Sequence, residues 1–194
     1  MSAPGGALPP FAPLADASRR LAAAGIPHAL GASGLLHAHG LCDHARDWDV
    51  TVEADRDQVE ALFADLKPRF VGSSGVHADS KLVLHDGVVE LILRFAFVVP
   101  GGIVRVPTFV DGEWQGIPLG ALEAWAAAYA LLGRPAKADL VFARLAERGA
   151  RAGALAAVLS QPLPAELAKR LRALPTAGGT GRGGSGHDPR AGRS

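Results

Sequence analysis

The chain has 194 residues, of which 48% are hydrophobic, so it can fill the core of one domain. Its formal net charge of +1 gives no strong overall field that would recruit a long nucleic-acid track or an anionic membrane. Cys42 is the single cysteine, which excludes an internal disulfide and argues against a cysteine-based zinc site. With no basic leader and no apolar stretch of membrane-spanning length, we expect a soluble, cytoplasmic protein.

The first 118 residues show the patterns of a mixed α/β fold. Residues 1–11 are rich in proline and glycine, and we expect them to form a flexible lead-in. A helix is predicted over 14–24, because Gly25 and then Pro27 stop its apolar spacing. The elements expected next are a strand over 28–30, a turn over 31–33, a short helix ending near residue 40, and a strand over 48–52.

The rest of this half adds one helix and two strands. Asp55 and Gln58 fit a capping box for a helix that Pro68 ends. A strand over 81–85 leads to Asp86-Gly87, a strong hairpin signal, which is followed by a strand over 88–97.

Near residue 120 the pattern becomes helical. Helices are predicted over 122–132, from Pro135 to about 148, over 150–160 and over 164–174. Residues 176–194 contain no apolar residue larger than alanine and proline, and they are expected to form a disordered tail. The sequence therefore predicts an α/β core over 12–118 and a helical part over 119–175 that packs on it as one compact unit.

An acidic pair stands at the start of the strand over 48–52. Residues two apart on a strand point to the same face, so Asp47 and Asp49 project together while Trp48, Val50 and Val52 face the core. Two carboxylates held close together repel each other unless a cation lies between them. Hard oxygen ligands of this kind suit Mg²⁺.

The turn Gly31-Ala32-Ser33 supplies a second candidate feature. A glycine lets the backbone approach a phosphate closely, and the exposed amides at the start of a helix attract anions. The Ser33 hydroxyl adds a hydrogen-bond donor. A site that holds phosphates on one side and a metal on the other is what phosphoryl-group chemistry requires.

The order of these features resembles the nucleotidyltransferase superfamily, including its minimal, aminoglycoside-modifying and toxin members. The pattern is a strand, a Gly-Ser or Gly-Gly-Ser turn, a helix, an Asp-x-Asp pair and a third acid on a later strand. Residues 29–52, ALGASGLLHAHGLCDHARDWDVTV, match it, and the segment 117–135 is similar to the helical region that follows the core in small members. The resemblance covers about residues 14–147, and it implies a mixed β-sheet with flanking helices followed by a C-terminal helical segment.

The resemblance also implies roles for individual residues. Gly31 and Ser33 would contact the triphosphate of an NTP, and Asp47 and Asp49 would ligate Mg²⁺. Glu90 falls at the place of the third acid, which serves as general base or metal ligand. The chain departs from the pattern in three places: the turn reads Gly-Ala-Ser, the third acid is Glu rather than Asp, and Asp43 and Ala45 replace an upstream Arg and Thr.

Several residues keep two interpretations. Arg46 and Lys81 are candidate phosphate partners or solvated side chains, and His44 is expected to be a loop histidine. Trp125 and Tyr129, at helical spacing, are expected in the core rather than as a platform for a base.

Three functions remain open: transfer of a nucleoside monophosphate to an acceptor hydroxyl, a nucleotide-binding or regulatory module that has lost activity, and an α/β interaction domain. The acceptor, whether a small molecule, RNA or protein, and the preferred base are not specified by the sequence.

Overall fold

The computed structural model describes residues 8–177, so most of the expected lead-in and most of the expected tail lie outside it. Its centre is a seven-stranded mixed sheet with the strand order β3-β4-β5-β2-β1-β9-β8, and a separate hairpin pairs β6 with β7. The strands are β1 (His28–Leu30), β2 (Trp48–Val52), β3 (Arg69–Val71), β4 (Ser80–Leu84), β5 (Val89–Leu93), β6 (Ala96–Val99), β7 (Gly102–Arg105), β8 (Val110–Trp114) and β9 (Ile117–Gly120).

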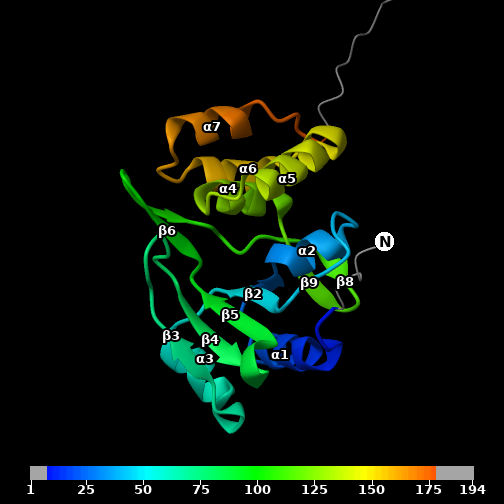
Figure 1. Ribbon diagram of the computed structural model, residues 1–194, viewed down its shortest axis with the longest axis vertical. Coiled ribbons are helices and arrows are strands. Elements are labelled where there is room, and N and C mark those ends of the chain that lie inside the picture. The colour runs from blue at the N-terminus through cyan, green and yellow to red at the C-terminus, as the bar shows by residue number, and fades with distance from the viewer. Residues whose placement is uncertain (1–7, 178–194) are drawn as a thin grey trace, which may run out of the picture.

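Seven α-helices surround the sheet in the described part of the chain. They are α1 (Phe11–Ala23), α2 (Ala32–Ala38), α3 (Arg56–Leu62), α4 (Leu122–Leu131), α5 (Pro135–Arg148), α6 (Ala152–Leu159) and α7 (Ala165–Arg172). Helices α4 to α7 gather at one end of the molecule and α1 and α3 lie at the other, with α2 between the sheet and the helical layer (Figure 1). No helix within residues 8–177 is long and apolar enough to cross a membrane.

The helices follow from their apolar spacing. On α1 the buried residues recur at intervals of three and four, at Leu14, Ala17, Ser18 and Leu21, so one face of the helix packs on the sheet. By contrast, α4 is buried on nearly every side, because it contacts α5, α6 and α7 and its Trp125 packs against Phe95 and Gly31. Helix α4 is therefore the central element of the helical half, against which α5, α6 and α7 pack.

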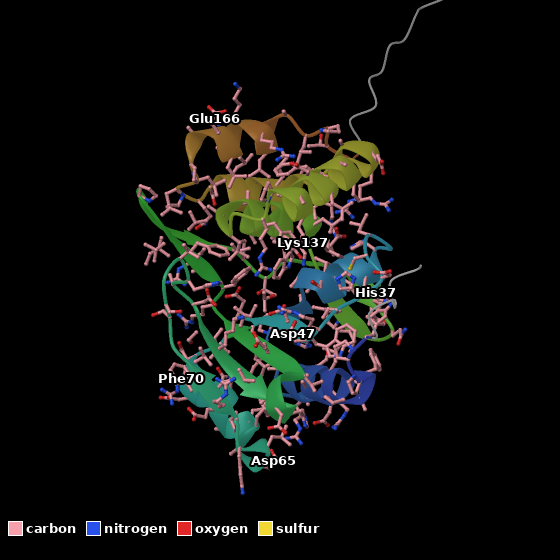
Figure 2. All side chains as sticks on the ribbon, viewed as in Figure 1. His37, Asp47, Asp65, Phe70, Lys137 and Glu166 are labelled. Atoms are coloured by element: carbon pink, nitrogen blue, oxygen red, sulfur yellow. The ribbon has the colours of Figure 1, made fainter. Side chains whose placement is uncertain are left out.

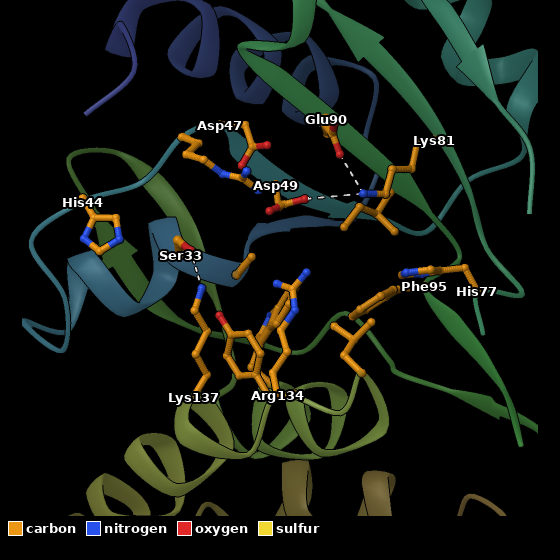
Figure 3. Close-up of a pocket in the computed structure, with 16 residues that line it drawn as sticks. Ser33, His44, Asp47, Asp49, His77, Lys81, Glu90, Phe95, Arg134 and Lys137 are labelled. Carbon is orange, nitrogen blue, oxygen red and sulfur yellow. Dashed lines mark hydrogen bonds and ion pairs between the residues drawn. The ribbon is translucent and has the colours of Figure 1, made fainter. Parts of the chain in front are cut away.

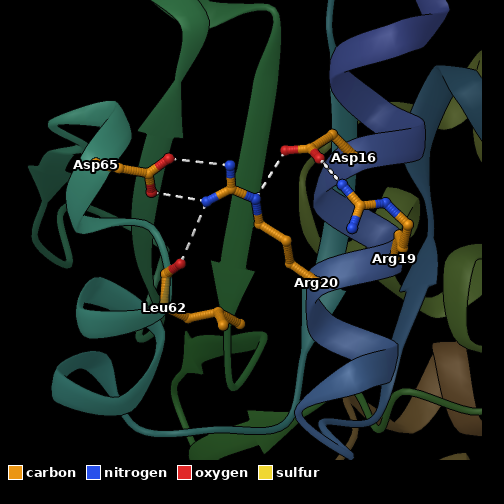
Figure 4. A network of polar contacts seen from close by, with 5 residues as sticks. All are labelled: Asp16, Arg19, Arg20, Leu62 and Asp65. Atoms are coloured by element: carbon orange, nitrogen blue, oxygen red, sulfur yellow. Dashed lines mark hydrogen bonds and ion pairs between the residues drawn. The ribbon is translucent and has the colours of Figure 1, made fainter.

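A polar network fixes α1 against the segment that follows α3 (Figure 4). Arg20 donates to both carboxylate oxygens of Asp65, at 2.7 and 3.0 Å, and it also pairs with Asp16 one turn earlier on α1. The hydrogen bond from Arg20 lowers the pKa of the Asp65 carboxyl. Because these groups are exposed, the network fixes the orientation of the segment more than it adds to stability.

The helices predicted in the C-terminal half and the first two strands are confirmed, whereas three other expectations are wrong. Asp55 makes no capping hydrogen bond, and its carboxylate instead pairs with Arg94 at 2.8 Å. The single strand expected over 88–97 is divided into β5 and β6, because Arg94 adopts a left-handed φ of 52° that no continuous strand accommodates. Residues 117–120, included in the helical segment, form strand β9.

The two ends of the described chain are held by backbone and side-chain hydrogen bonds. Trp48 Nε1 donates to the carbonyl of Pro10, at the end of the expected lead-in. At the other end, Thr176 forms a parallel bridge with Ala150, and Ala177 N donates to the Ala150 carbonyl at 2.8 Å. The first two residues of the expected tail therefore pair with the helical half.

Candidate active site

A cavity of about 470 Å³ lies between the sheet and the helical layer. In Figure 2, Lys137 lies on the side of the helical layer and Asp47 on the side of the sheet. The residues that line the cavity include every predicted site residue except Gly31: they are Ala32, Ser33, His44, Arg46, Asp47, Asp49, His77, Lys81, Glu90, Ile92, Phe95, Trp125, Tyr129, Leu132, Arg134 and Lys137.

The sheet places the three acids together. Asp47 directly precedes β2 and Asp49 lies within it, and the predicted alternation is confirmed because Trp48, Val50 and Val52 are fully buried on the opposite face. Strand β5 runs parallel to β2 and aligns Glu90 with Asp49. Neighbouring side chains in register share one face of a sheet, so Glu90 stands beside Asp49 and lines the same cavity.

Lys81 lies between two of these carboxylates. Its Nζ donates to Glu90 Oε2 at 2.6 Å and lies 3.8 Å from Asp49 Oδ1 (Figure 3). Strand β4 presents the lysine, pairing antiparallel with β5 on the side away from β2. One ammonium group therefore pairs with two carboxylates, and Asp47 has no ion-pair partner among the described residues.

The electrostatics at Asp49 reflect this excess of negative charge. Burial raises the pKa of the Asp49 carboxyl to about 7, with Lys81 opposing the rise and Asp47 and Glu90 adding to it. The side chain is 17% exposed, so little water remains to stabilise its charge. A cation placed beside Asp49 would remove this penalty.

The three acids do not form a ready-made metal cage. Within residues 8–177, no three histidine, cysteine or carboxylate side chains are close enough together to hold a metal ion. The donor set still fits Mg²⁺, which uses one or two carboxylates and completes its shell with water and substrate phosphates. Asp47 and Asp49, with Glu90 alongside, are the residues that would hold it.

Cations and hydroxyls face the acids from the opposite wall. Lys137, on α5, donates from Nζ to Ser33 Oγ at 2.9 Å, and Arg134 immediately precedes that helix (Figure 3). Burial lowers the pKa of Lys137, and the nearby charge of Arg134 adds to the effect. Two cations held close together and partly away from water favour an anionic ligand.

Gly31 has a packing role that the sequence did not indicate. Its backbone is extended, with φ of −127° and ψ of −163°, so it needs no glycine for its conformation. A Cβ at this position would lie only 1.9 Å from Cζ2 of Trp125, because the indole ring of α4 packs directly on the turn. The glycine therefore permits this contact, and Ser33 is the residue of the turn that brings a polar side chain to the cavity.

Asp43 and Ala45, the two residues that depart from the family pattern before the acidic pair, do not line the cavity. Asp43 is exposed and accepts a hydrogen bond from His44, and Ala45 is buried. Arg46 and His44, by contrast, both line the cavity.

Lining residues that the sequence did not predict at the site include His77, Phe95, Tyr129, Arg134 and Lys137. Tyr129 and Trp125 were expected in the core, and they are buried there, but they also form part of the cavity wall.

A second cavity of about 330 Å³ adjoins the first and shares His77, Lys81 and Glu90 with it. Asp79, whose side chain is 1% exposed, accepts a hydrogen bond from His77 Nδ1 at 3.1 Å. His77, Lys81 and Glu90 therefore line both cavities.

No protein-family model matches this chain, and no curated protein is significantly similar to it. The solved structures that are similar include the following two. One, from Thermotoga maritima, is assigned as a nucleotidyltransferase; it is 24% identical, with 70% of this chain and 91% of that one covered and a TM-score of 0.49. The other is the antibiotic-resistance factor ANT(2'')-Ia, an aminoglycoside nucleotidyltransferase, at 15% identity, 82% and 87% coverage and a TM-score of 0.50. The likeness to the second structure shows that the chain has the nucleotidyltransferase-like fold that its sequence predicts.

Proposed function

We propose that this protein is a magnesium-dependent nucleotidyltransferase that transfers a nucleoside monophosphate from an NTP to an acceptor hydroxyl. One observation carries the proposal: a single cavity brings three acids from the sheet opposite a serine, a lysine and an arginine from the turn and the helical layer. The arrangement offers a cation site on one wall and phosphate donors on the other, as phosphoryl transfer requires.

The roles divide between the two walls. Asp47 and Asp49 would hold Mg²⁺, which neutralises charge on the phosphates and helps align them. Ser33, Lys137 and Arg134 would contact the phosphate oxygens, with Arg46 at the edge of the cavity. Lys81 would leave Asp49 when the metal binds and then pair with a phosphate oxygen, keeping its contact with Glu90.

The acceptor would approach Glu90 from the second cavity, because Glu90 lines both. There the carboxylate would accept the proton of the acceptor hydroxyl, whose oxygen bonds to the α-phosphorus while the bond to pyrophosphate breaks. Apart from Arg69, each charged group in the second cavity is already paired, Asp79 with His77 and Glu90 with Lys81. This balance favours a neutral or anionic acceptor over a polycation.

A specific contact favours a second function, a nucleotide-binding module without activity. Lys81 lies 2.6 Å from Glu90 and neutralises the carboxylate that would act as base. If Lys81 does not move to a phosphate oxygen when nucleotide binds, its charge stays with Glu90, and the protein binds an NTP without transferring it.

Two measurements test the proposal. Melting temperatures with each of the four NTPs at millimolar Mg²⁺ should rise, because a ligand that binds only the folded state stabilises it. Labelled NTP, incubated with small-molecule, RNA and protein acceptors, should then label one class and release pyrophosphate. Binding without transfer would favour the inactive module, and no shift with any NTP would leave only an interaction domain.

A further inference from the structure

Tyr129 carries a buried polar group that the proposed chemistry does not yet use. The residue lies on α4, is 0% exposed and lines the first cavity. Its hydroxyl has no hydrogen-bond partner within the described part of the chain. Buried polar atoms in folded proteins are nearly always paired, so an unpaired hydroxyl in a cavity wall indicates a ligand that completes it.

The surroundings of Tyr129 indicate which part of a nucleotide would accept a hydrogen bond from its hydroxyl. Lys137 Nζ lies 5.5 Å from the centre of the tyrosine ring and donates to Ser33 Oγ at 2.9 Å. Tyr129 therefore stands on the wall that carries the donors. The apolar lining that would suit a base comes from other residues, Ile92, Phe95 and Leu132.

The hydroxyl is both protonated and fixed in place. Burial, and secondly the charge of Asp49, raise the pKa of Tyr129 well above its ordinary value, so the group keeps its proton and can donate. The tyrosine ring packs on Trp125 with 5.7 Å between ring centres, and Trp125 packs in turn on Gly31. A neutral donor held in this way loses little entropy when it binds an acceptor.

We propose that the Tyr129 hydroxyl donates a hydrogen bond to a phosphate oxygen of the nucleotide and completes a phosphate-binding cluster with Ser33 and Lys137. The proposal rests on the proposed function and adds a specific contact to it. It assigns Tyr129 to the phosphates and not to the ribose or the base.

The substitution Tyr129→Phe tests this contact with inorganic tripolyphosphate and Mg²⁺ as the probe. By titration calorimetry, the affinity for magnesium tripolyphosphate and for Mg-ATP should fall about tenfold, the usual consequence of losing one hydrogen bond to a charged group. The melting temperature of the free protein should stay the same or rise, because phenylalanine removes a hydroxyl that had no partner. Unchanged affinity for tripolyphosphate in a folded variant would overturn the proposal.

Thr108→Val is the matched control. Thr108 Oγ1 is also buried without a partner among the described residues, but it does not line the first cavity. Its removal should leave the affinity for both probes unchanged. An equal loss in the two variants would mean that the effect is a general consequence of removing a buried hydroxyl, and it would overturn the assignment.

A second measurement uses the fact that the chain has one tyrosine. Protein labelled with 3-fluorotyrosine gives a single fluorine resonance, which should shift when magnesium tripolyphosphate is added and stay in place when adenosine is added. A shift with adenosine alone would move Tyr129 to the nucleoside and overturn the proposal. If the wild-type protein binds neither Mg-ATP nor tripolyphosphate, the proposed function fails as well; if it binds both and Tyr129→Phe binds them equally, only this inference fails.

Discussion

Replacing Asp49 by asparagine should stabilise the free protein and abolish its response to Mg-NTP. Asparagine keeps the size of the side chain but carries no charge, so it resembles the protonated form of the aspartate. In the wild type, burial raises the pKa of Asp49 from 3.8 to about 7. The folded state therefore binds a proton more tightly than the unfolded state, and its stability falls as the pH rises through this interval.

The size of the effect follows from the two pKa values. They differ by about 3, and each pKa unit corresponds to about 1.36 kcal/mol. Relative to its value at low pH, the free energy of unfolding of the wild type is therefore lowered through Asp49 by about 4 kcal/mol at pH 8, by about 2 kcal/mol at pH 5 and by almost nothing below pH 3. Because Asp49→Asn removes this cost, its stability advantage over the wild type should grow with pH across the same range.

Urea unfolding without metal, at several pH values from 5 to 8, measures the difference, and melting curves with and without Mg-NTP measure the ligand response. Asp86→Asn is the control: Asp86 is exposed on the β4–β5 turn at a φ of 54°, which asparagine tolerates. It should show neither effect. A destabilised Asp49→Asn variant with a wild-type response to Mg-NTP would refute the reasoning and make Asp49 a structural residue.

Three further predictions concern the fold. Gly31→Ala should lower the free energy of unfolding in urea by about 1–3 kcal/mol through overpacking, and the double variant with Trp125→Phe should recover part of it; no loss would contradict the packing role of the glycine. Glu123→Ala should lower the free energy of unfolding by about 2 kcal/mol, because this fully buried side chain accepts a hydrogen bond from the Arg151 backbone at 2.7 Å. Glu123→Gln, which keeps an acceptor oxygen, should lower it by less; equal losses in the two variants would show that the charge alone matters. A chain ending at Ala177 should melt like the full chain, whereas one ending at Leu174 should melt lower, since it lacks the backbone pairing with the helical half.

The sheet side of the site was accessible from the sequence because it depends on local rules. Alternation along one strand is enough to put Asp47 and Asp49 on one face and Trp48 in the core. The position of Glu90 beside Asp49 depends on the parallel pairing of β2 with β5, which hydrophobic periodicity does not predict. The family pattern, with its third acid on a later strand, predicted this position instead. The roles of all three acids remain predictions.

The helical side of the site was not accessible in this way. Ser33 and Lys137 are 104 positions apart in the chain, and neither residue carries a local signal that it meets the other. Strands β3, β7, β8 and β9 were missed for a different reason. They are three to five residues long, and β3, β7 and β8 are largely exposed, so the alternation that marks a half-buried strand is absent.

Lys81 offsets part of the negative charge of the three acids in the free protein. In the free protein its ammonium group donates a hydrogen bond to Glu90 and lies near Asp49, and it reduces the repulsion between the carboxylates. The weaker of these two contacts, at 3.8 Å, is the one that a metal on Asp49 would replace. Mg²⁺ would then supply the charge that Lys81 gives up, and the lysine would be free to contact a phosphate while Glu90 holds it in the cavity. On this account the exchange of one cation for another couples metal binding to phosphate binding, so neither ligand alone should stabilise the protein as much as the two together.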